Sequence, residues 1–144
     1  FAAFCGVSSK EKEPKGAGYY SGNIVVDGGG VFQAGQLVEV ALIVDALKPT
    51  DVVTAFGIFL TLPAGWSFAS MGSSSCTPEI KPRVGATDTA DFAWISPPTP
   101  PVSLSFFLRA AGTSPGTISG NAAYRLDGGE LNDDLVAAAV TPAK

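Results

Sequence analysis

The stretch VEVALIVDALKPTDVVTAFGIFLTL, residues 38–62, decides the fold class of this chain. Apolar side chains occupy every second position in residues 38–44 and again in residues 56–62. A period of two is that of a β-strand with one buried face. Between these runs, KPTD at residues 48–51 has the proline and polar residues that favour a turn. The stretch therefore predicts two consecutive strands, each with one face in a core.

The same alternation continues on both sides of this stretch, and no segment has helical spacing. Gly-, Pro- and Ser-rich segments separate the runs, with the longest loop expected at residues 72–89 and a PPTPP connector at residues 97–101. About eight short strands at such intervals predict an all-β fold, a two-sheet antiparallel β-sandwich of immunoglobulin-like or jelly-roll type. Strands are predicted at residues 19–26, 35–47, 53–62, 66–68, 91–95, 102–109, 117–126 and 135–140.

The chain is expected to hold one folded domain preceded by a tail. Its 144 residues suit a single core, and 46% hydrophobic with 15% charged residues excludes general disorder. Residues 1–6 are apolar, whereas VSSKEKEPKGAG at residues 7–18 is typical of a flexible tether. We therefore expect a tail and tether at residues 1–18 and a β-sandwich domain at residues 19–144.

Charge argues against nucleic acid as a partner, and hydropathy argues against a membrane-spanning helix. With a net charge of −4, and with basic residues that are scattered apart from a short stretch at residues 10–15, the chain has no surface that could neutralise a nucleic-acid backbone. No apolar run reaches the length of about 20 residues that a transmembrane helix needs. The chain starts at Phe1, as a product whose export signal has been removed would, so we expect a secreted, extracellular or cell-surface protein. Cys5 and Cys76 fit either one disulfide, which export would favour, or two separate thiols.

Three pieces of the sequence resemble the cohesin and carbohydrate-binding-module type of β-sandwich found in bacterial extracellular proteins. They are AGQLVEVALIVDAL at 34–47, VVTAFGIFLTLPAGWSFASM at 52–71 and VSLSFFLRAAGTSPGTISGNAAYRL at 102–126. The resemblance implies a cohesin-like sandwich, an extracellular location, and binding of a protein or a carbohydrate. No partner-contact residue of a cohesin maps onto this sequence, so the resemblance names no ligand.

The sequence contains no histidine, which removes Ser-His-Asp and Cys-His catalysis and most zinc and haem sites. A carboxylate pair could still cleave glycosides, but Glu39 and Asp45 fall on the outward face of one strand. Charged side chains on such a face are normally solvated. We therefore expect a protein that is not an enzyme and has no organic cofactor.

Asp127, Glu130, Asp133 and Asp134, together with Asn132, form the densest group of oxygen ligands, of the kind that calcium prefers. A structural calcium site is one hypothesis for this segment. Its spacing does not match an EF-hand loop, and Asp-Gly-Gly at residues 127–129 is also typical of a hairpin turn. A solvated turn is the alternative.

Aromatic residues raise two further alternatives. Trp94, Tyr19 and Tyr20 could form a platform on which sugar rings stack, or they could pack in the core. Trp66 lies in register with Phe68, a spacing that favours the core.

Phe59 and Phe107 fall on the face opposite the main core set of their strands, which indicates that something covers that face. Phe1 and Phe4 lie in the apolar tail and also need a docking site. These four residues are the candidates for binding a partner protein. The leading hypothesis is a non-enzymatic extracellular structural or adhesive domain that assembles with protein, plausibly with its own copies in a filament, through its tail or a sheet edge. The alternative is a cohesin-like protein receptor or a carbohydrate-binding module.

Overall fold

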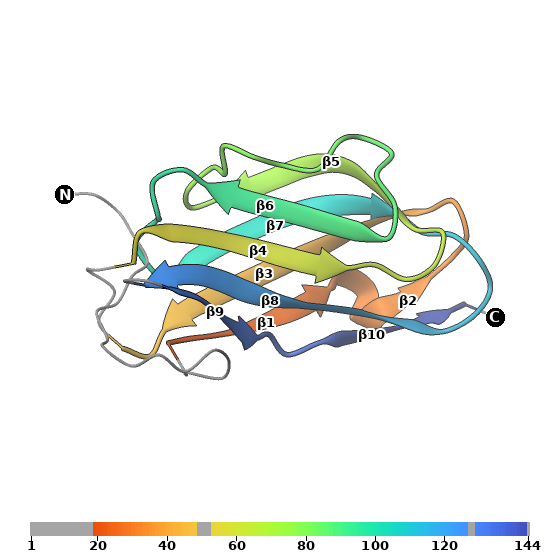
Figure 1. The fold of residues 1–144 in the computed structure, drawn as a ribbon. Coiled ribbons are helices and arrows are strands. Elements are labelled where there is room, and N and C mark those ends of the chain that lie inside the picture. The colour runs from red at the N-terminus through yellow and green to blue at the C-terminus, as the bar shows by residue number, and fades with distance from the viewer. Residues whose placement is uncertain (1–18, 49–52, 127–128, 144) are drawn as a thin grey trace.

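Figure 1 shows the computed structural model, which describes residues 19–48, 53–126 and 129–143. Two β-sheets lie face to face, and the short 3-10 segment η1 (Asp27–Gly30) links β1 to β2. The first sheet has four strands in the order β1-β3-β7-β5, all antiparallel. These strands are β1 (Tyr20–Val26), β3 (Leu37–Ala46), β7 (Val102–Arg109) and β5 (Ser67–Ser74).

The second sheet has six strands in the order β2-β10-β8-β4-β6, and β9 also pairs with β8. Its strands are β2 (Val31–Phe32), β4 (Ala55–Thr61), β6 (Thr89–Trp94), β8 (Gly116–Leu126), β9 (Gly129–Asp134) and β10 (Ala138–Pro142). All pairs in this sheet are antiparallel except β2 with β10. The all-β two-sheet sandwich predicted from the alternation is therefore confirmed.

The core lies between the sheets and is built from the alternate residues that the sequence indicated. On β3, Val38, Val40, Leu42 and Val44 are buried, whereas Glu39 is exposed. Aromatic rings join the two layers, as in the group of Phe68, Phe92 and Phe106, whose centroids are 5.1 to 6.3 Å apart. Trp66 is 1% exposed and donates a hydrogen bond from Nε1 to the Ala111 carbonyl, which confirms its place in the core.

The structure has ten strands where about eight were expected. The two additions are β2, which is only two residues long, and β9, whose sequence GELNDD has too few apolar residues to be recognised as a strand. β9 forms because it pairs with β8 from Leu126↔Gly129 to Asn121↔Asp134. The last strand also begins at Ala138, three residues later than expected, because residues 135–137 cross towards β1.

Other segments of the chain cover parts of the sheet edges. At β1, Ile24 donates its N–H to the Val136 carbonyl at 3.0 Å. At β5, Phe68 donates to the Ala86 carbonyl at 2.9 Å, and at β6, Ala93 donates to the Ile80 carbonyl at 2.9 Å. Such contacts occupy backbone groups of an edge strand that could otherwise pair with another chain. The outward faces of the sheets are therefore better placed than these edges to bind a partner.

Candidate functional site

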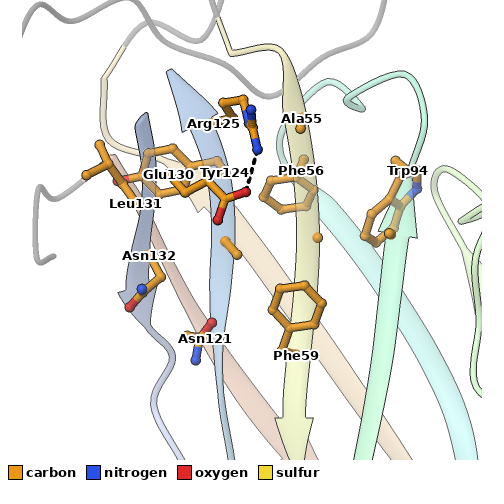
Figure 2. A pocket seen from close by; sticks show the side chains of 13 residues that line it. Ala55, Phe56, Phe59, Trp94, Asn121, Tyr124, Arg125, Glu130, Leu131 and Asn132 are labelled. Carbon is orange, nitrogen blue, oxygen red and sulfur yellow. Dashed lines mark hydrogen bonds and ion pairs between the residues drawn. The ribbon is translucent and has the colours of Figure 1, made fainter. Parts of the chain in front are cut away.

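A shallow hollow of about 390 Å³ opens on the outward face of the six-stranded sheet (Figure 2). Its floor is a row of small residues that crosses neighbouring strands. Gly57 on β4 is paired with Ala93 on β6 and with Ala123 on β8. Because directly paired residues point to the same face of a sheet, these three positions lie side by side. Their small size leaves the space that larger outward side chains would fill.

The two sides of the hollow differ in chemistry. One side is formed by Phe59 on β4 and Asn121 on β8, which are paired across the sheet. The opposite side carries Arg125 and Glu130, whose ion pair measures 2.6 Å (Figure 2). The side chains of this ion pair are 54% and 73% exposed, so it contributes little to stability and either partner can turn to a ligand. Asn132, on β9, lines the hollow where it reaches that strand.

Phe59 is the largest exposed apolar side chain of the hollow, with 40% of its surface accessible. Its ring leans along β4, so that Cζ lies 3.3 Å from where a Cβ on Gly57 would be. Gly57 therefore makes room for the ring to lie over the strand. The prediction that Phe59 faces away from the core of its strand is confirmed, while its role as a contact residue stays a prediction.

Two acidic residues stand in the same row as Phe59. Asp91 on β6 is paired with Phe59, and Asp134 on β9 is paired with Asn121. Both carboxylates are exposed, and within the described part of the chain neither makes an ion pair. The side of the hollow that carries the aromatic ring is therefore acidic.

The four residues predicted to bind a partner are not brought together. Phe107 is half-buried on the outward face of the four-stranded sheet, beside Glu39 on β3 and Ser70 on β5. It therefore lies on the opposite side of the sandwich from Phe59. Phe1 and Phe4 lie outside the described residues, and for both the binding role stays a prediction.

The structure corrects the sugar-stacking hypothesis for the three aromatic residues that carried it. Trp94 is 3%, Tyr19 0% and Tyr20 2% exposed, so none offers a ring face to a sugar. In the core, Tyr20 and Trp94 each pack against Phe56, at centroid distances of 5.1 and 5.3 Å. A sugar on this sheet would have to stack on Phe59 instead.

The structure also separates the carboxylates proposed to bind calcium. The pleat of β9 turns Glu130 and Asp134 outward, whereas Asp133 points inward and is 4% exposed. Within residues 19–48, 53–126 and 129–143, no three acidic or cysteine side chains meet as a metal ion would require. Asp127 lies outside the described residues. The grouping in sequence therefore does not become a grouping in space for the three described carboxylates.

Asp133 has a structural role. Its Oδ2 accepts hydrogen bonds from the backbone N–H groups of Tyr19 and Tyr20 at 3.0 and 2.9 Å, and from the Tyr124 hydroxyl at 2.9 Å. Burial, together with this hydrogen bond and the charge of Asp133, raises the pKa of Tyr124 well above its usual value. The cluster holds the start of the domain against β9.

The predicted disulfide stays a prediction, because Cys5 lies outside the described residues. Cys76 is half-buried and packs against the core. Its carbonyl accepts a hydrogen bond from Trp94 Nε1 at 2.8 Å, which ties the loop after β5 to β6.

The residues of the hollow floor were missed by the sequence reasoning. Gly57, Ala93 and Ala123 are separate in sequence and become neighbours only through strand pairing. Small residues at outward positions of otherwise bulky strands are the only signal that could have pointed to them. The hollow presents the exposed Phe59 ring, the amides of Asn121 and Asn132 and the exposed charges of Arg125 and Glu130.

Comparison with solved structures finds this fold in the full-length major pilin SpaD of Corynebacterium diphtheriae, with a TM-score of 0.61 and 11% identity. The match covers 83% of this chain and 34% of the pilin, so this chain spans about a third of the pilin's length. At this identity the likeness shows the β-sandwich fold alone.

Two weaker likenesses have TM-scores too low to add to the fold assignment. The reeler domain of human F-spondin matches with a TM-score of 0.43 and 14% identity, over 96% of this chain and 95% of that one. A cohesin module of a Clostridium perfringens family 33 glycoside hydrolase matches with a TM-score of 0.36 and 10% identity, over 85% of this chain and 98% of that one. No family model and no curated protein matches the sequence. Among the described residues, no helix is long and apolar enough to cross a bilayer.

Proposed function

We propose that this chain is a non-enzymatic extracellular structural domain that binds protein, and that its partners include copies of itself. The observation that carries the proposal is Phe59, a large apolar side chain 40% exposed beside a hollow on an outward sheet face. With Gly57, Ala93 and Ala123 the ring forms a continuous apolar area, and such an area on a folded domain is typical of an interaction site. The absence of histidine from the sequence supports a binding role over catalysis.

The fold and the edges of the sandwich support the same proposal. The fold is shared with part of a protein named as a major pilin. Because loop segments hydrogen-bond to β1, β5 and β6, assembly through a sheet face agrees better with the structure than strand addition at those edges. In a face contact that does not close on itself, each copy would bind the next and produce a filament.

The test is the mass of the full chain in solution. Sedimentation velocity over a range of concentrations, with electron microscopy of the concentrated sample, should show species larger than a monomer. Deletion of residues 1–6 should return the protein to a monomer, because the apolar tail is the proposed contact with a neighbouring copy. A chain that stays monomeric at every concentration and at low salt would contradict the proposal.

Carbohydrate binding is the second candidate, and one observation favours it. The Phe59 ring lies beside Asn121, and Asn132 lines the same hollow, a combination that can stack on a sugar and bond its hydroxyl groups. A glycan array screened with the full chain tests this candidate. Binding that is lost in Phe59→Ala but retained in Ile43→Ser would support a carbohydrate ligand on this face.

A further inference from the structure

The hollow is shaped to take a side chain or a short peptide segment. Its volume of about 390 Å³ is at the small end of ligand sites. The floor row continues beyond Ala93 to Ile80, whose isolated bridge with Ala93 places the two on the same face, and Ile80 is 55% exposed. An apolar strip therefore continues from the floor of the hollow across β6 to Ile80, which itself lies outside the hollow. An aromatic side chain lying on Ala93 or Ala123 against the Phe59 ring would bury apolar surface on both partners.

The charge around the hollow favours a basic occupant. Asp91 and Asp134 flank the row of Phe59 and Asn121, and Arg125 on the other side is already paired with Glu130. The four charged residues of the site therefore sum to a net negative charge. A segment that carries lysines as well as an aromatic residue would meet complementary charge.

One segment of this chain has that chemistry. FAAFCGVSSKEKEPK, residues 1–15, joins two phenylalanines to three lysines. The three lysines and two glutamates of residues 1–18 give this part a net charge of +1. Because the whole chain has a net charge of −4, residues 19–144 have a net charge of −5. The segment and the remainder of the chain therefore carry net charges of opposite sign.

The anchoring of Tyr19 favours a segment from a neighbouring copy over the chain's own segment. Tyr19 donates its N–H to Asp133, which points inward on β9, whereas Asn132 next to it lines the hollow on the outward face. Tyr19 is therefore held on the inner side of β9, whereas the hollow opens on the outward face. A neighbour's segment can approach the open face directly.

We propose that the hollow over Gly57 binds residues 1–15 of a second copy of this chain, with a phenylalanine of that segment beside Phe59 and its lysines near Asp91 and Asp134. This inference rests on the proposed self-association and names the site at which it occurs. The contact is head-to-tail, because the segment and the hollow are different surfaces.

The direct test uses a synthetic peptide of residues 1–15 with Cys5→Ser, titrated into the full chain that carries Phe1→Ser and Phe4→Ser. Proton–nitrogen NMR should show saturable shifts of the backbone amides of Gly57, Asn121 and Asn132. The amide of Ile43, on the outward face of the other sheet, should not shift. Absence of saturable shifts, or shifts confined to the other sheet, would overturn the proposal.

Two sets of variants test the chemistry of the hollow. Ala123→Leu fills the floor and should weaken peptide binding by about tenfold or more. Ile43→Ser is the matched control, because Ile43 is an exposed apolar residue at 55% on the other sheet, and it should leave binding unchanged. The double variant Asp91→Lys, Asp134→Lys should bind the native peptide more weakly. It should bind a peptide in which glutamates replace the three lysines more tightly than the unmodified chain does. Thermal unfolding followed by circular dichroism verifies that each variant is folded.

The remaining outcomes each decide the proposal. Differences at the hollow between the unmodified chain and the Phe1→Ser, Phe4→Ser chain at concentrations where both are monomeric would show that the chain's own tail occupies the site, against the proposal. Shifts produced by an oligosaccharide and not by the peptide would replace it with the carbohydrate function. Tail-dependent self-association that Ala123→Leu leaves intact would contradict this site alone, whereas a strictly monomeric chain would contradict the proposed function.

Discussion

Asp133 shows how one residue can decide the local structure of this protein. The carboxylate is 4% exposed, yet it is stable there because two backbone N–H groups and the Tyr124 hydroxyl donate to it. A buried charge without such donors would be strongly unfavourable. The same contacts attach Tyr19, the first described residue, to β9, which makes Asp133 the anchor of the domain's first strand.

Asp133→Ala should destabilise the fold by about 3 kcal/mol, because it leaves three buried donors without their acceptor. Asp134→Ala, a change at the exposed neighbour on the same strand, should alter stability by less than about 0.5 kcal/mol. Urea denaturation of both variants followed by circular dichroism measures the difference. Equal losses of unfolding free energy in the two variants would mean that the hydrogen bonds to Asp133 do not stabilise the fold.

The raised pKa of Tyr124 predicts a loss of stability at alkaline pH. In the unfolded chain a tyrosine loses its proton near pH 10, whereas the buried hydroxyl keeps it to higher pH. The stabilisation is therefore complete below about pH 10 and is lost as the pH rises towards the folded-state pKa. Urea midpoints measured between pH 8 and pH 11, in unmodified protein and in Tyr124→Phe, should show a shallower decline in the variant.

At the scale of the strands, close approach between β4 and β8 depends on a glycine. A Cβ on Gly120 of β8 would lie 2.5 Å from the Phe59 carbonyl oxygen and 2.5 Å from Leu60 Cδ2. Real Cβ atoms do not approach a backbone oxygen so closely, so the strands would have to move apart.

Gly120→Ala is expected to cost about 2 kcal/mol, because the new methyl group overpacks the interface of β4 and β8. Gly129→Ala is the matched control, since Gly129 is also in a strand and a Cβ there meets nothing within 4 Å. That control should change stability by no more than about 1 kcal/mol. Thermal melts of the two variants give the comparison, and a neutral Gly120→Ala would show that the pair of strands can relax.

At the scale of the whole molecule, stability depends on aromatic side chains that reach from one sheet to the other. Phe92 on β6 packs on Phe106 of β7 at 5.1 Å between centroids and on Phe68 of β5 at 6.3 Å. These contacts connect the six-stranded and the four-stranded sheet. Neither sheet has a second apolar layer of its own to replace this one, so the two layers should fold as a unit.

Phe92→Ala should lower the free energy of unfolding by about 3 to 5 kcal/mol, because it removes a fully buried ring and leaves a cavity. Both sheets should respond together. Guanidinium denaturation of the variant, followed by the fluorescence of Trp66 and Trp94 and by circular dichroism, should give coincident transitions at lower denaturant. Separate transitions would mean that the sheets unfold independently.

Much of the fold could be predicted from residue alternation, and little of the site. Val38 to Val44 on β3 and Phe56 to Leu62 around β4 show their buried face directly in the sequence. β9 was missed because a polar strand is recognisable only from its partner. The burial of Trp94, Tyr19 and Tyr20 was left open, because an aromatic residue suits both a core and a binding surface.

The amino-acid sequence by itself determined the all-β class, the main strands, their buried faces and the outward position of Phe59, because these depend on a period of two that is local. Only the tertiary structure decided which outward residues are neighbours. The hollow requires Gly57, Ala93 and Ala123 from three strands in one register, and the separation of Asp133 from Glu130 and Asp134 requires the pleat of a strand held by β8. Strand order and register arise from contacts between residues far apart in the chain, which no local pattern encodes.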